Sequence, residues 1–89
     1  MILPTEKGNG YSDEGVIPNE ETAIKIAETI WFSIYGDSIY SKQPFKAEYN
    51  KQEKCWYVSG TLSENTRGGV PEMKISKMDG KILYINHGK

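Results

Sequence analysis

Few residues of this sequence are suited to nucleophilic or metal chemistry, and they are widely spaced. The only histidine, His87, lies far along the chain from the only cysteine, Cys55. A catalytic thiol needs a base beside it, and His87 is the only conventional one. A metal site needs several ligands together, and His87 has no second ligand nearby in the sequence. This spacing favours a packing role for Cys55 and predicts no metal site.

Two further kinds of catalytic site are considered, a carboxylate pair and a phosphate-binding loop. The chain has 12 Asp and Glu residues, but none falls in an apolar run that would raise its pKa. Phosphate-binding glycine loops follow a strand, whereas Gly8, Gly10 and Gly15 precede every predicted strand. We therefore predict a protein that is not an enzyme and binds no cofactor.

Binding chemistry is better represented, because lysine and tyrosine side chains alternate along the predicted strands. Aromatic rings among lysines on a sheet can stack single-stranded RNA. Against this, Glu48 and Glu72 fall on the same face, Arg67 is the only arginine, and the net charge is −1. We therefore predict no nucleic-acid partner, and a mixed polar surface that suits a protein partner.

Length and composition place the chain among small single domains. With 89 residues, of which 37% are hydrophobic, it is long enough for one core layer but short for a deep pocket. No apolar run is long enough to cross a membrane or to form a signal core, so we predict no membrane partner. The sequence as given points to the cytoplasm, and a signal removed beforehand would place the protein in the periplasm.

A helix is predicted over residues 20–35. Asn19 is a favourable N-cap residue, and Gly36 suits the left-handed position that ends many helices. Apolar residues recur at spacings of three and four and indicate one buried stripe: Ala23, Ile26, Ala27, Ile30 and Ile34. Residues 1–17 are glycine-rich without an apolar period, which predicts a flexible N-terminal arm. Residues 18–89 then form a single domain.

Four strands are predicted after the helix. In the first hairpin, alternation sets Tyr49 opposite Trp56 and Ala47 opposite Val58, which brings the apolar residues of both strands to one face. In the second hairpin, a three-residue loop ending at a left-handed Gly80 sets two apolar pairs opposite each other. The predicted strands run from about residue 45 to 49, 55 to 62, 70 to 77 and 81 to 87.

The second hairpin completes the predicted core. Its loop would pair Ile75 with Leu83 and Met73 with Ile85. A slip of one residue would turn all four side chains to the other face. The predicted fold class is therefore α+β, with one N-terminal helix packed on a four-stranded antiparallel meander sheet.

Several segments in a fixed order carry a resemblance to a known family: residues 21–28, 34–36, 44–45, 56–62, 68–71, 75–83 and 87–89. Over residues 19–89 the chain resembles bacterial immunity proteins of polymorphic toxin systems with a nuclear-transport-factor-2-like fold, also called the YbbC/YhhH family. The resemblance implies an abbreviated cystatin-like or nuclear-transport-factor-2-like domain. It also implies a protein that binds and neutralises a cognate toxin by protein–protein contact, and it transfers no catalytic residues.

Two other functions stay open at this point. The hairpin around residues 79–83 also resembles PepSY-type domains, which implies a peptidase-regulating module. A small enzyme with a pocket between helix and sheet is the third hypothesis, and it would need His87 beside a carboxylate in that pocket. A gene for a large toxin next to this one would favour the immunity function over both.

The predicted partner-binding surface is the face of the sheet turned away from the helix. Six side chains are expected there: Lys46, Glu48, Tyr57, Ser59, Lys74 and Tyr84. Protein interfaces favour surfaces that mix tyrosine with polar residues. Two tyrosines on a solvated face could instead pack on a second copy in a homodimer. The acidic residues Asp13, Glu14, Glu20 and Glu21 are the alternative binding surface.

Overall fold

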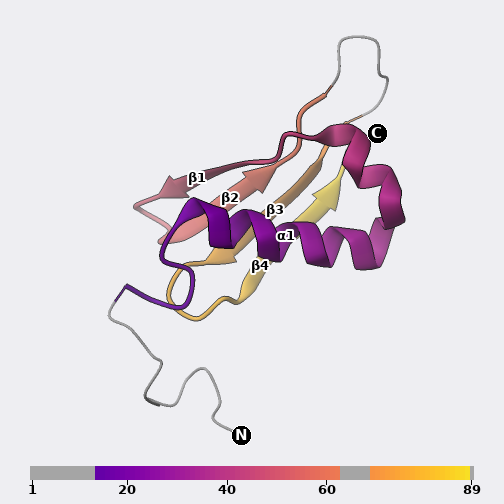
Figure 1. The fold of residues 1–89 in the computed structure, drawn as a ribbon. Helices are drawn as coiled ribbons and strands as arrows, with labels where there is room; N and C mark the ends of the chain where they lie inside the picture. Colours follow the sequence, from indigo (N-terminus) through magenta and orange to yellow (C-terminus); the bar gives the residue numbers. More distant parts are fainter. Residues whose placement is uncertain (1–13, 63–68, 89) are drawn as a thin grey trace, which may run out of the picture.

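The computed structural model describes residues 14–62 and 69–88, which form one helix lying across one face of a sheet (Figure 1). The sheet is antiparallel with the order β1-β2-β3-β4. The elements are α1 (Glu20–Tyr35), the 3-10 helix η1 (Gly36–Lys42), β1 (Lys46–Asn50), β2 (Cys55–Ser59), β3 (Pro71–Ser76) and β4 (Ile82–His87). The predicted α+β class and meander are confirmed. Within these residues, no helix has the length and apolar character needed to cross a bilayer.

Local capping signals set the ends of α1, and the predicted bounds are confirmed. The side chain of Asn19 accepts a hydrogen bond from the Thr22 N–H at 2.9 Å, and Gly36 follows with a φ of 77°. The fully buried positions are Ala23, Ala27 and Trp31, so two small residues let the helix approach the sheet closely. Ile34, predicted to be buried, is 56% exposed because it lies in the last turn, where the chain leaves for η1 (Figure 1).

The segment before α1 belongs to the folded body. The N–H groups of Val16 and Ile17 donate to the carbonyls of Met78 and Lys77, both at 3.1 Å. Ile17 is fully buried, and its carbonyl accepts the Trp56 indole N–H at 2.9 Å. The C-terminal boundary predicted for the N-terminal arm, residue 17, is therefore wrong. Val16 and Ile17 are hydrogen-bonded to the β3–β4 turn and belong to the folded domain. Residues 1–13 of that arm lie outside the described residues.

The first hairpin has the predicted register, with Tyr49 opposite Trp56 and Ala47 opposite Val58. The rings of Tyr49 and Trp56 lie 5.3 Å apart between centroids. β2 ends at Ser59, earlier than predicted, since the Gly60 N–H still donates to Pro71 of β3 but the Thr61 N–H donates to Lys42 outside the sheet. The core therefore lies between α1 and the inner sides of β1, β2 and β3.

The second hairpin is only partly as predicted. Met73 faces Ile85, and Gly80 has a φ of 75°. Ile75, however, faces Ile82 and not Leu83, because the register shifts between Lys74 and Ile75. Such a shift places two residues of one strand opposite one of the other. The predicted Ile75–Leu83 pair is wrong.

Leu83 is also not part of the core, because it remains 47% exposed. α1 packs chiefly against β1 and β2, and less against β3. β4 lies at the far edge of the sheet, so its inner side is the least covered by the helix (Figure 1).

Candidate functional site

The cross-strand register places all six predicted binding residues on one face of the sheet. Residues directly opposite each other in neighbouring strands share a face. One row runs across the four strands through Glu48, Tyr57, Lys74 and Tyr84. The adjacent row holds Lys46 and Ser59, and continues through Glu72 and Asn86. These two rows form the outer face, on the side of the sheet opposite α1.

A hydrogen-bonded cluster around Glu72 fixes one part of the outer face. The Tyr57 hydroxyl donates to one carboxylate oxygen of Glu72. The Asn86 amide donates to the other oxygen at 3.3 Å. The hydrogen bond to Glu72, with a smaller contribution from desolvation, raises the pKa of Tyr57 to about 12. The half-buried Tyr57 ring is therefore held in one orientation, with its hydroxyl engaged.

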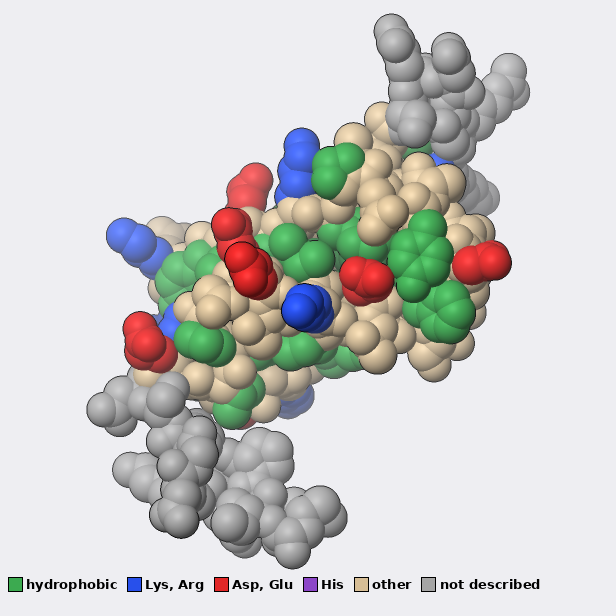
Figure 2. All heavy atoms as spheres, in the orientation of Figure 1, with side chains coloured by type: hydrophobic (Ala, Val, Ile, Leu, Met, Phe, Trp, Pro, Cys, Tyr) green, Lys and Arg blue, Asp and Glu red, His purple; other side chains and the backbone are tan. Residues whose placement is uncertain are grey.

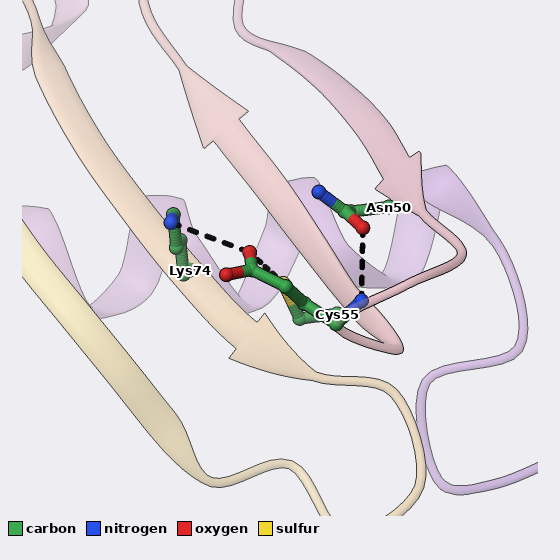
Figure 3. Close-up of polar contacts among 4 residues, drawn as sticks. Asn50, Cys55 and Lys74 are labelled. Carbon is green, nitrogen blue, oxygen red and sulfur yellow. Dashed lines mark hydrogen bonds and ion pairs between the residues drawn. The ribbon is translucent and has the colours of Figure 1, made fainter.

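A second cluster is built around Glu53, in the turn between β1 and β2 (Figure 3). The Lys74 ammonium lies 3.3 Å from a Glu53 carboxylate oxygen. The Cys55 thiol lies 3.7 Å from the same oxygen, and the Glu53 N–H donates to the Asn50 side chain at 2.9 Å. Residues of the turn and of β3 thus meet over the start of β2.

Cys55 is fully buried although it shares the side of the sheet with Tyr57. Burial is the main cause that raises the pKa of the Cys55 thiol, and the neighbouring Glu53 carboxylate adds to it. A raised pKa keeps the thiol protonated, which is the unreactive form. The geometry therefore agrees with a packing role for this cysteine.

A hollow of about 250 Å³ lies beside these clusters. Its lining residues come from β1, β2, β3 and the intervening turn: Glu48, Tyr49, Asn50, Glu53, Cys55, Tyr57 and Lys74. Pockets that enclose small ligands usually measure about 300–1,000 Å³. The hollow is thus small for a substrate but large enough for a side chain of a partner.

The fold does not bring Cys55 and His87 together as a catalytic pair. Cys55 faces Ser76 at one end of β3, whereas His87 faces Pro71 at the other end. Five residue steps along a strand separate these ends by about 17 Å. The His87 ring instead packs edge-on against Tyr35, with centroids 5.0 Å apart. Across residues 14–62 and 69–88, no three His, Cys, Asp or Glu side chains are grouped to hold a metal ion.

Sequence reasoning missed Asn50, Glu53 and Asn86 as members of this face. Asn86 follows Tyr84 by two positions, so alternation along the strand was a usable signal. Asn50 and Glu53 lie at the edge of a turn, where no periodicity indicates which side chains fold back over the sheet. The contacts of Glu53 depend on the hairpin geometry and had no signal in the sequence.

Comparison with known proteins gives two matches. The model of a family described as NTF2 fold immunity protein matches residues 22–89. The uncharacterized protein YhhH of Escherichia coli strain K12 is 33% identical over 86 residues, which cover 94% of this chain and 66% of that protein. The chain thus spans just under two thirds of the length of this relative. No solved structure matches the chain.

Proposed function

Since the chain belongs to the NTF2 fold immunity protein family, we propose that it binds a cognate toxin and neutralises it by protein–protein contact. We place the contact on the outer face. The observation that carries this choice is the row in which Tyr57 and Tyr84 flank Lys74. Because β4 is an edge strand, this row reaches the rim of the sheet at Tyr84, which is 44% exposed.

The chemistry of this row suits a protein interface. Tyrosine supplies a large contact area with few rotatable bonds, so little conformational entropy is lost when it binds. The Tyr57 hydroxyl is already bonded to Glu72, and the Lys74 ammonium to Glu53. Side chains held in place before binding lower the cost of ordering them in the complex. The outer face therefore offers partly preorganised anchors.

The hollow next to this row suggests what the toxin contributes. Two carboxylates line it, Glu48 and Glu53, against one ammonium from Lys74. Lys74 is paired with Glu53, which leaves Glu48 as the carboxylate available to a partner. A lysine or arginine of the toxin inserted here would meet an excess of negative charge. We therefore place a basic side chain of the toxin in this hollow.

The test is a calorimetric titration against the cognate toxin. We expect Tyr57→Ala with Tyr84→Ala to weaken binding strongly, because truncating a central interface aromatic costs roughly 2–4 kcal/mol. Tyr40→Ala is the matched control: Tyr40 is 41% exposed, close to the 44% of Tyr84, but lies in η1. Lys51→Ala, in the β1–β2 turn, should also have little effect.

Two results would contradict the proposal. Unchanged affinity of the folded double variant would move the interface to the acidic side of α1, at Glu20 and Glu21. Equal losses for Tyr40→Ala and the double variant would show that the outer face has no special role. Circular dichroism of each variant separates a loss of binding from a loss of folding.

A further inference from the structure

β4 is an apolar strand with large exposed side chains on both sides. The exposed fractions are 36% for Ile82, 47% for Leu83, 44% for Tyr84 and 37% for Ile85. No lysine, arginine, aspartate or glutamate occurs between Ile82 and His87. Figure 2 shows hydrophobic side chains on the α1 side of the molecule, below the middle of the helix, where β4 lies in Figure 1. An exposed apolar edge strand of this kind is a template for pairing with another strand.

The two edge strands of the sheet differ in the charge of their side chains. β1, at the opposite edge, carries the charged residues Lys46 and Glu48, and both are exposed. Charged side chains on an edge strand oppose pairing with a further strand. Within the described part of the chain, nothing pairs with the outer edge of β4. The apolar edge is thus the one that can extend the sheet.

The hydrogen-bonding groups at this edge follow from the β3–β4 ladder. The Gly88 N–H donates to the Val70 carbonyl at 3.2 Å. In an antiparallel ladder, pairs with and without hydrogen bonds alternate. The backbone groups of Asn86 and Tyr84 therefore point towards β3, and those of His87 and Ile85 point towards the open edge.

We propose that β4 pairs with β4 of a second copy of this chain, antiparallel about a twofold axis, to form a continuous sheet of two molecules. An axis perpendicular to the sheet keeps both helices on the same side and makes the contact self-complementary. In the register with Tyr84 on the axis, Ile85 lies opposite the bulge around Leu83 of the second copy. Tyr84 faces its own counterpart on the outer face.

The lack of charged side chains in β4 favours a second copy of this chain as the strand that pairs with its open edge. No lysine, arginine, aspartate or glutamate occurs between Ile82 and His87, so no such side chains face each other along the two paired strands. The net charge of −1 per chain adds little repulsion between copies. A strand of a strongly charged partner would instead place its charges against Ile82, Leu83 and Ile85, where they would lose water without gaining a counter-charge.

The size of the contact sets its strength. Each of the four side chains is less than half exposed, so at about 200 Å² for a large side chain they supply at most roughly 400 Å². A standard interface buries about 800 Å² per partner. We therefore expect a weak, reversible dimer whose population depends on protein concentration.

Sedimentation velocity of the full chain, from about 1 to 200 µM, tests the proposal. We expect a shift from monomer to dimer across this range, and a monomer throughout for Leu83→Lys. Leu62→Lys is the matched control, since Leu62 is 46% exposed and Leu83 47%, and Leu62 follows β2 instead of lying in β4. A wild-type monomer at every concentration overturns the proposal, and so does a dimer that survives Leu83→Lys.

A cross-link tests the register. Tyr84 lies on the axis as a pair without hydrogen bonds, for which Cα atoms are about 4.5 Å apart, within the range of a disulfide. We expect Tyr84→Cys to give a covalent dimer on mild oxidation, whereas Tyr49→Cys on β1 stays monomeric. Cross-linking of both variants, or of neither, refutes this register. Because Leu83 belongs to neither row of the outer face, the sedimentation result for Leu83→Lys does not depend on whether the outer face binds a toxin.

Discussion

The two tryptophans provide the sharpest test of the core, because they are both buried but differ in one hydrogen bond. Trp56 is 9% exposed, and its indole N–H donates to the Ile17 carbonyl at 2.9 Å. Trp31 is fully buried, and its indole nitrogen has no hydrogen-bond partner among the described residues. Each ring also contacts one other aromatic ring, Tyr49 or Phe45, with centroids 5.3 Å apart in both pairs. Comparison of Trp56→Phe with Trp31→Phe therefore isolates the contribution of the hydrogen bond between Trp56 and Ile17.

The expected cost differs between the two variants. Both lose packing worth about 1–2 kcal/mol, within the usual range for a smaller core residue. Trp56→Phe also leaves the buried Ile17 carbonyl without its donor, which costs about 1–3 kcal/mol more. Trp31→Phe removes a buried N–H that has no acceptor, so part of its packing loss is offset. We expect Trp56→Phe to be the less stable variant by about 2 kcal/mol.

Thermal and urea unfolding followed by far-UV circular dichroism measures this difference. A domain of this size has a total stability of roughly 4–13 kcal/mol, so losses of this size are large enough to measure. A difference of about 2 kcal/mol corresponds to roughly 8–16 °C in Tm. Equal stabilities, or a less stable Trp31→Phe, would refute the role assigned to the contact between Trp56 and the segment before α1. Phe32→Ala, at an exposed ring (48%), should cost much less than either and serves as the control.

Two further predictions concern the Tyr57 hydroxyl and Gly15. Because the hydrogen bond to Glu72 raises the pKa of Tyr57 from 10.0 to about 12, its contribution to stability is complete below pH 10 and is lost as the pH rises towards 12. Ultraviolet titration should show one tyrosine ionising late, and Glu72→Gln should lower that pKa; an unchanged titration curve would exclude the hydrogen bond. Gly15 has a φ of 89°, and a Cβ there would lie 2.4 Å from the Lys77 carbonyl oxygen, whereas Gly36 has a φ of 77° with open space around it. Gly15→Ala should therefore lower the Tm clearly more than Gly36→Ala, and the reverse order would show that the segment before α1 is not held against the β3–β4 turn.

The parts of the fold that follow from local chemistry could be predicted from the sequence. Asn19 and Gly36 set the ends of α1 through groups within the helix and its first flanking residues. The register of the first hairpin followed from alternation, because a slip of one residue would turn Trp56 and Val58 away from the side of Tyr49 and Ala47. Gly80 was found because a left-handed position in a short hairpin loop favours glycine.

The parts that were missed depend on contacts between distant segments. Ile17 belongs to the core because Trp56, far along the chain, donates to its carbonyl, and no periodicity signals such a contact. Leu83 has the residue type of a core position, yet its exposure depends on where α1 lies over the sheet. That position is over β1 and β2, with less contact to β3.

The incomplete cover of the sheet by α1 connects the two proposed surfaces. A helix packed over β1 and β2 leaves β4 with apolar side chains on both of its sides, and leaves the outer face uncovered by α1. β4 then carries parts of both surfaces at adjacent positions, since Ile85 faces Met73 on the α1 side and Tyr84 faces Lys74 on the outer face. Leu83→Lys therefore acts on strand pairing without altering the outer face, and Tyr57→Ala acts on the outer face without altering β4. Tyr84 alone belongs to both surfaces, so a loss of toxin binding in Tyr84→Ala that is absent in Leu83→Lys assigns the toxin contact to the outer face and not to the dimer.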